Sequence, residues 1–228
     1  MRLSIIIPVY NEKATLLALL EKVRAVPLEK EIIVVDDGST DGTRELLKEL
    51  EKKSSADLVF VYQGRNRGKG AAIRRGMEKV TGEVVVIQDA DLEYEPMDLV
   101  RLIQPIIRGE ARVVYGSRVL GRNPKSSFSF YLGGRFLSWL TNLLYGTSLT
   151  DEPTCYKMFR TEVLRSLSLK CRGFEFCPEV TAKVSRQGVK IVELPIRYYP
   201  RTLEQGKKIS WRDGLVAIWT LIRYRFNR

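Results

Sequence analysis

Short runs of branched apolar residues recur along the first hundred positions and constrain the fold more than any other feature of the chain. The four runs lie at residues 3–9, 31–35, 58–62 and 84–87. Their Val, Ile and Leu content is typical of strands buried on both faces, as in a parallel sheet. Segments between them, such as 13–26, carry apolar residues at helical spacing. This alternation predicts a doubly wound α/β domain with a mostly parallel sheet flanked by helices.

Elements of the same kinds are expected further along the chain. Residues 111–118 and 189–196 are predicted strands, and residues 130–149 are a predicted helix. Pro8 is expected to end the first strand, because proline has no N–H to donate to the ladder.

The fourth apolar run ends in three acidic side chains within one short turn, namely Asp89, Asp91 and Glu93. In an open α/β sheet, ligands gather at the carboxyl ends of the strands. Hard oxygen ligands in that position suit Mg²⁺ or Mn²⁺, which could in turn hold a diphosphate. A solvated acidic loop is the alternative, since an isolated D-x-D motif often arises by chance.

Two other predicted strands end in polar loops that should fall at the same edge of the sheet. These loops are Tyr10-Asn11-Glu12 and Asp36-Asp37. A further loop, Gly68-Lys69-Gly70, precedes a predicted helix but lacks the spacing of a Walker A loop. Its glycines and lysine favour a phosphate nearby, although a plain helix start explains them as well.

The composition narrows the chemistry. The 228 residues include no histidine, so a general base must be a carboxylate, lysine, tyrosine or cysteine, and a histidine-ligated zinc site is excluded. Three cysteines without a C-x-x-C pair favour a reducing cytosol. No signal peptide is expected, and no apolar stretch approaches the roughly 20 residues that span a bilayer. We therefore expect a cytoplasmic protein, with peripheral contact on the inner face of the cell membrane as an option.

Charge is divided unevenly along the chain. Residues 1–100 hold 15 Lys/Arg and 18 Asp/Glu, whereas the remaining residues hold 23 and 9. A strongly basic second half suggests an anionic partner, which could be a phosphorylated acceptor, an anionic membrane surface or a nucleic acid. Solvated surface charge is the simpler explanation.

Four of these segments occur in a specific order: Pro8-Val9-Tyr10-Asn11-Glu12, residues 35–43, Asn66-Arg67-Gly68-Lys69-Gly70 and Asp89-Ala90-Asp91. Together they resemble the family 2 glycosyltransferases, which have a GT-A fold, and most of all the dolichyl-phosphate mannose synthase branch. The resemblance is strong over the first ~120 residues and moderate over the remainder.

The resemblance implies a role for each matching position. Asp37 would hydrogen-bond the base, and Asp91, with Asp89 and Glu93, would hold Mg²⁺ or Mn²⁺ at the donor diphosphate. The nucleotide-sugar pocket would be lined by Pro8, Tyr10, Glu12, Asp37, Lys69, Asp89 and Ala90.

The second half would supply the acceptor side of the site. The resemblance assigns basic side chains to an acceptor phosphate: Arg118, Arg135, Arg201 and Lys207, with Lys208 as an alternative to Lys207. Positive charge gathered there favours a lipid phosphate as the acceptor.

Asp151 is a candidate for acceptor positioning or for the general base. It lies in residues 150–160, which resemble the family's T-D-x-x-T-G-x-[KR] segment with Cys155 in place of glycine. Glu175 and Glu179 are rival carboxylates. A hydroxyl acceptor needs such a base near its reacting oxygen, whereas an ionised phosphate does not, so the choice among the three stays open.

Two helical segments could meet a lipid. Residues 130–149 are rich in large apolar groups, which suit core packing or a lipid tail. Residues 211–228 fit an interfacial amphipathic helix and fit equally a helix docked on the core. We expect one GT-A domain over residues 1–210, with a nucleotide-sugar half (1–120) and an acceptor half (121–210), followed by the helix at 211–228.

These features favour a metal-dependent, inverting glycosyltransferase that moves a hexose from GDP-mannose or UDP-glucose to a polyprenyl or dolichyl phosphate. One alternative is a glycosyltransferase with a carbohydrate hydroxyl acceptor, acting in cell-envelope polysaccharide or glycolipid synthesis. Another is a nucleotide- or nucleic-acid-binding module. The second half does not interleave aromatic and basic residues as a stacking platform would, so no nucleic acid partner is expected.

Overall fold

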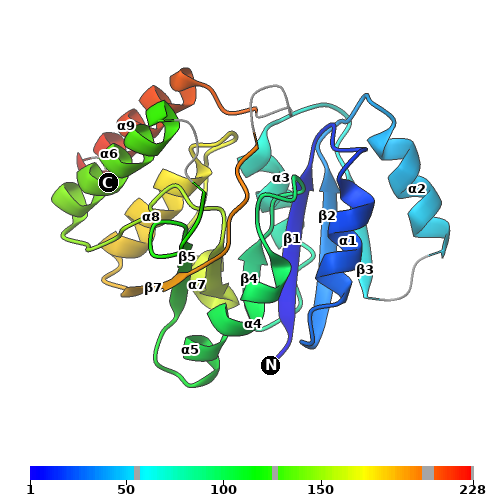
Figure 1. Cartoon of the computed structure of the whole chain (residues 1–228), viewed down its shortest axis with the longest axis horizontal. Coiled ribbons are helices and arrows are strands. Elements are labelled where there is room, and N and C mark those ends of the chain that lie inside the picture. The colour runs from blue at the N-terminus through cyan, green and yellow to red at the C-terminus, as the bar shows by residue number, and fades with distance from the viewer. Residues whose placement is uncertain (54–56, 125–127, 202–207, 227–228) are drawn as a thin grey trace.

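The computed structural model describes residues 1–53, 57–124, 128–201 and 208–226. Its strands form one sheet in the order β3-β2-β1-β4-β6-β5-β7, flanked by helices (Figure 1). The strands are β1 (Leu3–Val9), β2 (Lys30–Asp36), β3 (Leu58–Tyr62), β4 (Val84–Ile87), β5 (Val113–Ser117), β6 (Lys157–Arg160) and β7 (Ile191–Pro195). All described strands except β6 run in one direction. The predicted fold class, a mostly parallel doubly wound sheet, is confirmed.

Helices cover both faces of the sheet, with α1 in front of it and α3 behind it in Figure 1. The α-helices are α1 (Leu16–Arg24), α2 (Thr43–Lys53), α3 (Lys69–Met77), α4 (Leu99–Leu102), α5 (Gln104–Ile107), α6 (Phe128–Tyr145), α7 (Thr161–Ser166), α8 (Phe176–Arg186) and α9 (Trp211–Phe226), and a 3₁₀ turn, η1, spans Pro96–Asp98. The helices predicted at 130–149 and 211–228 are therefore present as α6 and α9, with small changes at their ends.

The sequence did not predict β6. This strand has only four residues, too few to display a period, and it pairs antiparallel with both β4 and β5. Its place in the middle of the sheet depends on partners more than 40 residues away, and such long-range pairing leaves no local signal.

Pro8 does not end β1, contrary to the prediction. The strand continues to Val9, and Pro8 pairs with Val35 of β2 in the parallel register. On the other side, pairing with β4 stops at Ile6, whose carbonyl accepts the N–H of Gln88. Alternate residues of a strand direct their N–H groups to opposite neighbours, so Pro8 faces the side where β4 has already ended. Its missing donor costs no ladder bond.

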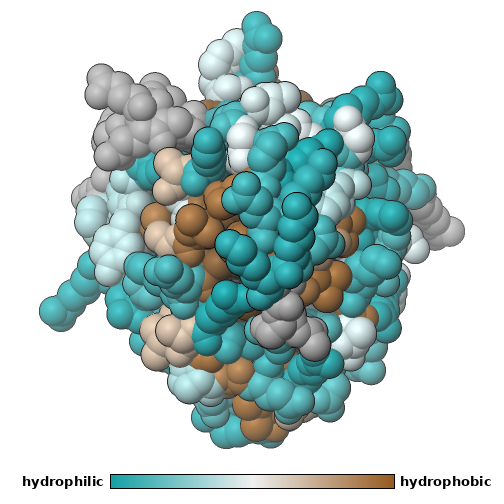
Figure 2. Space-filling view, turned by 90° about the vertical axis from the view of Figure 1, so that its right-hand side faces the viewer, coloured by the Kyte–Doolittle hydropathy of each residue, from teal (hydrophilic) through white to brown (hydrophobic). Residues whose placement is uncertain are grey.

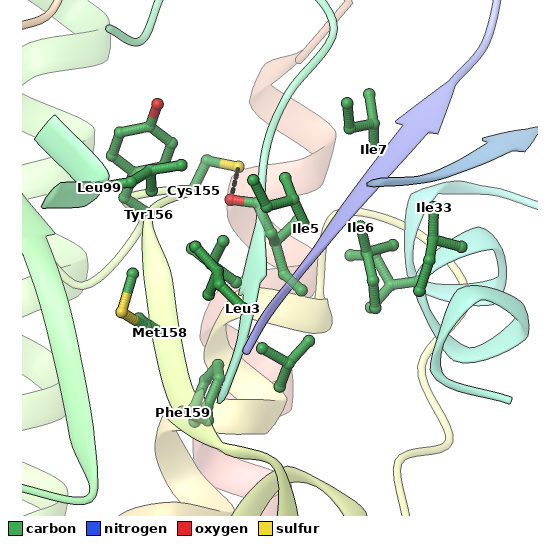
Figure 3. Packing of buried hydrophobic residues seen from close by; sticks show 14 of the residues in the cluster. Leu3, Ile5, Ile6, Ile7, Ile33, Leu99, Cys155, Tyr156, Met158 and Phe159 are labelled. Carbon is green, nitrogen blue, oxygen red and sulfur yellow. Dashed lines mark hydrogen bonds between the residues drawn. The ribbon is translucent and has the colours of Figure 1, made fainter. Parts of the chain in front are cut away.

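The main core lies on both faces of β1. Figure 3 shows Leu3 and Ile5 next to Met158 and Phe159 of β6, while Ile6 lies by Ile33 on the other face. All of these side chains are fully buried. Because successive side chains of a strand alternate between faces, β1 contributes to two packed layers at once. A rigid central strand fixes where its carboxyl end, and hence the following loop, lies.

The two ends of the sheet carry different surfaces. The face seen in Figure 2, at the right-hand side of Figure 1 where α2 lies, is covered mostly by hydrophilic residues. At the opposite end, α6 and α9 lie side by side above α8. No described helix is both long and apolar enough to cross a bilayer.

Candidate functional site

A cavity of about 1170 Å³ runs along the carboxyl edge of the sheet and continues between α6 and α9. It begins at the ends of β1, β2 and β4, where the polar loops predicted from the sequence lie. Apart from the rival carboxylates Glu175 and Glu179, every predicted site residue that the structure describes lines it: Pro8, Tyr10, Glu12, Asp37, Lys69, Asp89, Ala90, Asp91, Glu93, Arg118, Arg135, Asp151 and Arg201. Lys207 lies outside the described residues. Lys208, its alternative, lines the cavity.

The acidic turn after β4 is held by cations. The Asp89 carboxylate lies 2.5 Å from the Lys69 ammonium group, at the start of α3. Asp91 Oδ2 lies 3.3 Å from an Arg201 guanidinium nitrogen, and Asp91 Oδ1 accepts the Glu93 N–H at 3.1 Å. Burial, with the nearby charges of Asp89 and Glu93, raises the pKa of Asp91 to about 7. A bound cation would relieve this repulsion.

Glu93 differs from Asp89 and Asp91 because its carboxylate is bound by other parts of the fold. It is buried, accepts the Tyr198 hydroxyl hydrogen at 2.8 Å, and accepts the Arg201 backbone N–H at 2.7 Å. No group of three Asp, Glu, Cys or His side chains among the described residues could hold a metal ion unaided. Asp89 and Asp91 nonetheless offer the hard oxygen ligands that Mg²⁺ and Mn²⁺ prefer. The residues therefore fit an ion whose remaining ligands come from donor phosphates and water, the arrangement usual for Mg²⁺.

Glu12, in the loop after β1, is the second centre of negative charge. Both terminal nitrogens of Arg201 donate to it, at 3.1 and 3.2 Å, and the Lys208 ammonium group donates at 2.7 Å. Thr15 also donates to it, at 2.8 Å. Burial would raise the pKa of Glu12, but the Arg201 and Lys208 contacts outweigh burial and lower it. Glu12 is therefore held as a carboxylate.

Asp37 fixes the loop that precedes α3. One carboxylate oxygen accepts the Arg67 N–H and the other accepts the Gly68 N–H, both at 2.8 Å. Gln63 adds a third hydrogen bond at 2.9 Å. Burial raises the pKa of Asp37 despite these bonds. Asp37 reaches the cavity, but its first structural contribution is to shape the 66–70 loop.

Two backbone N–H groups at the start of α3 are already engaged within the protein. The N–H groups of Gly70 and Ala71 donate to the carbonyls of Gly173 and Arg172, at 3.2 and 2.9 Å. A Cβ at Gly68 would lie 2.5 Å from the Arg172 oxygen, so this glycine allows a close approach of two backbones. Packing against the 171–173 backbone accounts for Gly68 and Gly70, a reason that neither the phosphate explanation nor the plain helix start included. Gly68 and Lys69 of this loop line the cavity, and Lys69 is the one of the two with a side chain that can contact a ligand.

Arg118, which is partly exposed, and the buried Asp151 form an ion pair at the end of β5. The Asp151 carboxylate accepts the Arg118 backbone N–H at 2.8 Å and two guanidinium hydrogens at 2.7 and 2.8 Å. Burial would lower the pKa of Arg118, but Asp151 outweighs burial and raises it. The Arg118 guanidinium also lies over the Tyr198 ring, 5.1 Å from its centroid. The Asp151 carboxylate thus uses three of its roughly four acceptor positions on Arg118.

The rival carboxylates lie elsewhere. Neither Glu175 nor Glu179 lines the cavity. Glu179 is a fully buried residue of α8 and accepts the N–H groups of Lys170 and Cys171 at 2.8 Å. Glu175 accepts the Arg172 N–H at 3.0 Å. Both carboxylates hold the 170–173 loop in place.

The sequence reasoning missed two residues that organise the site. Glu193 of β7 accepts the N–H groups of Thr150 and Asp151, at 2.6 and 3.0 Å, and so holds the loop that carries Asp151. Tyr198 contacts Arg118 through its ring and Glu93 through its hydroxyl group. It therefore links the two sides of the cavity. Tyr198 follows the short strand β7 in a segment without a recognised motif. The one sequence signal for a site residue there is an aromatic side chain just after a strand end.

The outer end of the cavity is apolar. Leu132, Phe136, Trp139 and Leu143 of α6 are 47–66% exposed, and five large apolar side chains of α9 are 45–74% exposed. The five are Trp211, Leu215, Val216, Trp219 and Phe226. Phe136 of α6 and Leu215 of α9 also line the cavity, so the same helices form its wall and an exposed apolar surface.

Comparisons with known proteins agree with this architecture. Residues 4–168 match the family profile described as "Glycosyl transferase family 2". The chain is 31% identical to the UDP-N-acetylglucosamine–dolichyl-phosphate N-acetylglucosaminyltransferase of Methanococcus voltae, over 98% of this chain and 96% of that protein. It is 29% identical to the undecaprenyl-phosphate mannosyltransferase of Micrococcus luteus, over the whole of both chains.

A solved structure shares the fold. Glucosyl-3-phosphoglycerate synthase from Mycobacterium tuberculosis, in complex with Mn²⁺, UDP-glucose and phosphoglyceric acid, superposes with a TM-score of 0.73 at 20% identity. The match covers 98% of this chain and 79% of that chain.

Proposed function

Because the chain belongs to glycosyltransferase family 2 and has the predicted GT-A fold, we propose that it is a divalent-metal-dependent hexosyltransferase whose acceptor is a polyprenyl phosphate. The donor is a nucleotide sugar, with GDP-mannose and UDP-glucose as the leading candidates. The two relatives compared are named as transferases to dolichyl and undecaprenyl phosphates, one of them from UDP-N-acetylglucosamine, so that donor belongs in the same test.

The donor binds in the half formed by residues 1–120. Asp89 and Asp91 hold Mg²⁺ or Mn²⁺, which when bound neutralises charge on the leaving diphosphate. Lys69 lies against Asp89, where its ammonium group can also reach a phosphate oxygen. Asp37 keeps the loop before α3 in shape beside the base. These side chains bind and orient the donor so that its anomeric carbon faces the second half of the cavity.

The acceptor binds in the half formed by residues 121–210 together with Arg118. Arg118 is oriented by Asp151, and Arg135 donates to the Thr150 carbonyl at 3.1 Å. A guanidinium group suits a phosphate because it presents several donors in a fixed plane. A phosphate oxygen of the acceptor attacks the anomeric carbon, and the bond from that carbon to the diphosphate oxygen breaks with inversion. The nucleoside diphosphate leaves.

The state of Asp151 is the observation that carries the choice of acceptor. A hydroxyl acceptor would need a base near its oxygen, and of the three carboxylates considered only Asp151 lines the cavity. That carboxylate accepts three hydrogen bonds from Arg118, which occupy three of its roughly four acceptor positions. A phosphate acceptor is already ionised and needs no base, which matches a site that offers an oriented arginine.

The exposed apolar surface of α6 and α9 fits a protein that works on a lipid. Helix α6 contains no acidic residue, and α9 contains Asp213 as its single one against Arg212, Arg223 and Arg225. Apolar side chains flanked by arginines suit peripheral contact with an anionic leaflet. The lipid tail would leave the cavity between these two helices, at a cytoplasmic membrane face.

The test is a transfer assay with purified protein and Mn²⁺. GDP-mannose, UDP-glucose and UDP-N-acetylglucosamine are each offered with a polyprenyl phosphate in vesicles, and lipid-linked product is identified by mass spectrometry. Chelation of the metal should abolish product. Transfer to a polyprenyl-diphosphate-linked sugar, with none to the polyprenyl phosphate, would instead establish a hydroxyl acceptor.

A further inference from the structure

Arg201, which the family resemblance assigned to an acceptor phosphate, lies where the two acidic loops of the donor half meet. Its guanidinium group donates to both oxygens of Glu12 at 3.1 and 3.2 Å and lies 3.3 Å from Asp91 Oδ2. Its backbone N–H donates to Glu93. One side chain thus bridges the loop after β1 and the loop after β4, which are otherwise separate in sequence.

The Arg201 side chain is incompletely satisfied in this position. Its Nε atom is buried and has no hydrogen-bond partner among the described residues. A buried donor without an acceptor destabilises its own arrangement. The guanidinium group contacts two carboxylates through its terminal nitrogens, but its Nε–H has no acceptor within the described part of the chain.

The charges around Arg201 nearly cancel. Four carboxylates of the loops after β1 and β4 line the cavity (Glu12, Asp89, Asp91 and Glu93). Within the part of the chain that the structure describes, the cationic side chains in ion pairs with them are Lys69, Arg201 and Lys208. A divalent cation added alone would face the Arg201 guanidinium beside Asp91. A nucleoside diphosphate added alone would face the carboxylates. Added together, the two bring little net charge.

We propose that Arg201 and the divalent cation compete for the carboxylate of Asp91, and that the diphosphate of the donor resolves this competition by binding the guanidinium group that the cation displaces. The inference rests on the proposed function and deepens it. Arg201 disfavours binding of the metal by itself and favours binding of the metal with the nucleotide. Its role is thermodynamic coupling between two ligands of one site.

The coupling is reciprocal, which makes it measurable from either side. If the nucleotide raises the affinity for the metal by some factor, the metal must raise the affinity for the nucleotide by the same factor. Removing Arg201 should weaken this factor from both directions. A residue that only stabilised the fold would not change it in this way.

The experiment measures binding of Mn²⁺ alone, of UDP and GDP alone, and of each nucleotide with Mn²⁺, by calorimetry and by the electron paramagnetic resonance of free Mn²⁺. Wild type is compared with Arg201→Met and with Arg197→Met. Arg197 is the matched control, since it pairs with Asp98 at 3.0 Å and does not line the cavity. Arg201→Lys tests whether a point charge replaces the planar group.

We expect Arg201→Met to bind Mn²⁺ alone on the order of tenfold more tightly than wild type, and to show a metal–nucleotide coupling factor lower by a similar ratio. Arg201→Lys should lie between the two, and Arg197→Met should match wild type. Unchanged or weaker binding of Mn²⁺ alone by Arg201→Met, with wild-type nucleotide binding, overturns the inference and leaves the proposed function standing. Failure of all variants and wild type to bind Mn²⁺ with either nucleotide overturns both.

Discussion

The two walls of the cavity are built in different ways. The donor wall consists of loops that directly follow the parallel strands β1, β2 and β4, so each functional side chain lies within a few residues of a buried strand. The acceptor wall gathers Arg118, Asp151 and the helices α6 and α9 from segments spread over a hundred residues. Polar contacts dominate the first wall, and an exposed apolar surface extends from the second.

This difference implies a division of labour that mutations can separate. On the donor wall, the acidic side chains of the site are already paired with lysine and arginine side chains. On the acceptor wall, large apolar side chains of α6 and α9 are exposed at the surface of the protein. Changes on the donor wall should affect nucleotide chemistry, whereas changes on the acceptor wall should affect recognition of the acceptor and of the membrane.

The largest expected effect comes from the donor wall. Asp91→Asn removes a charge from the proposed metal site and should lower transfer by about 100- to 1,000-fold, the cost of losing one strong electrostatic contact to a transition state. Steady-state transfer assays measure it, with circular dichroism to verify the fold. The control is Glu95→Gln, because Glu95 pairs with Lys22 outside the cavity. Equal activity of Asp91→Asn and wild type would remove the metal site from the donor wall.

A somewhat smaller effect is expected from the ion pair of the acceptor wall. Arg118→Met alone leaves Asp151 buried without its partner and should destabilise the fold by about 3–5 kcal/mol. The double variant Arg118→Met/Asp151→Asn removes both charges and should regain most of that stability, as measured by urea unfolding.

Transfer by the double variant should still be about 10- to 100-fold lower, since a hydrogen bond to a charged group is worth roughly 1.5–3 kcal/mol. The loss should fall on acceptor use, with nucleotide binding close to wild type. Normal transfer by this variant would show that the pair is only structural, and would break the distinction between the two walls.

A third prediction concerns the exposed apolar surface. Trp139→Ser/Trp219→Ser should weaken binding to anionic vesicles by about tenfold, because two half-exposed indole rings lose burial in the lipid interface. Co-sedimentation with vesicles measures it. Leu17→Ser is the control, since Leu17 of α1 is comparably exposed at 44% but lies away from α6 and α9. Transfer to a water-soluble short-chain prenyl phosphate should be retained, and equal losses in both variants would contradict a specific membrane face.

The smallest effect on transfer is expected at Glu179, which the structure places outside both walls. Burial would raise the pKa of Glu179, but its bonds to Lys183, Cys171 N, Tyr224 and Lys170 N outweigh burial and lower it below 4.5. A lowered carboxyl pKa stabilises the folded state above the ordinary pKa, and the contribution is lost as the pH falls through the lowered value.

Glu179→Gln should therefore reduce the free energy of unfolding by about 1–3 kcal/mol at pH 7 and by less near pH 3, with transfer little changed. Urea unfolding at the two pH values measures this difference. Glu175→Gln, which removes a more exposed carboxylate with one backbone contact, serves for comparison. A large loss of transfer at unchanged stability would restore Glu179 as a functional carboxylate.

The same contrast between the walls explains what the sequence could predict. Strands, buried cores and the residues that follow strand ends are encoded locally, so the positions of Asp89, Asp91 and Glu12 at one edge followed from the order of elements. Three other features depend on partners distant in the chain. They are the pairing of the antiparallel strand β6, the hydrogen bonds of Arg118 to Asp151, and the backbone hydrogen bond of the α3 start to Arg172. Neither periodicity nor a motif reports such contacts.

The position of β6 also bears on how the protein is made. This strand, Lys157–Arg160, pairs with β4 on one side and β5 on the other, so both of those strands keep an unpaired edge until residue 160 has left the ribosome. Open edges of apolar strands invite pairing with other chains, and long-range pairing slows folding. During synthesis, the strands β1 to β4 of the nucleotide-binding half are therefore complete while the edge of β4 is still unpaired. Strand β5 joins the sheet only through β6, and β7 adds to β5 later still.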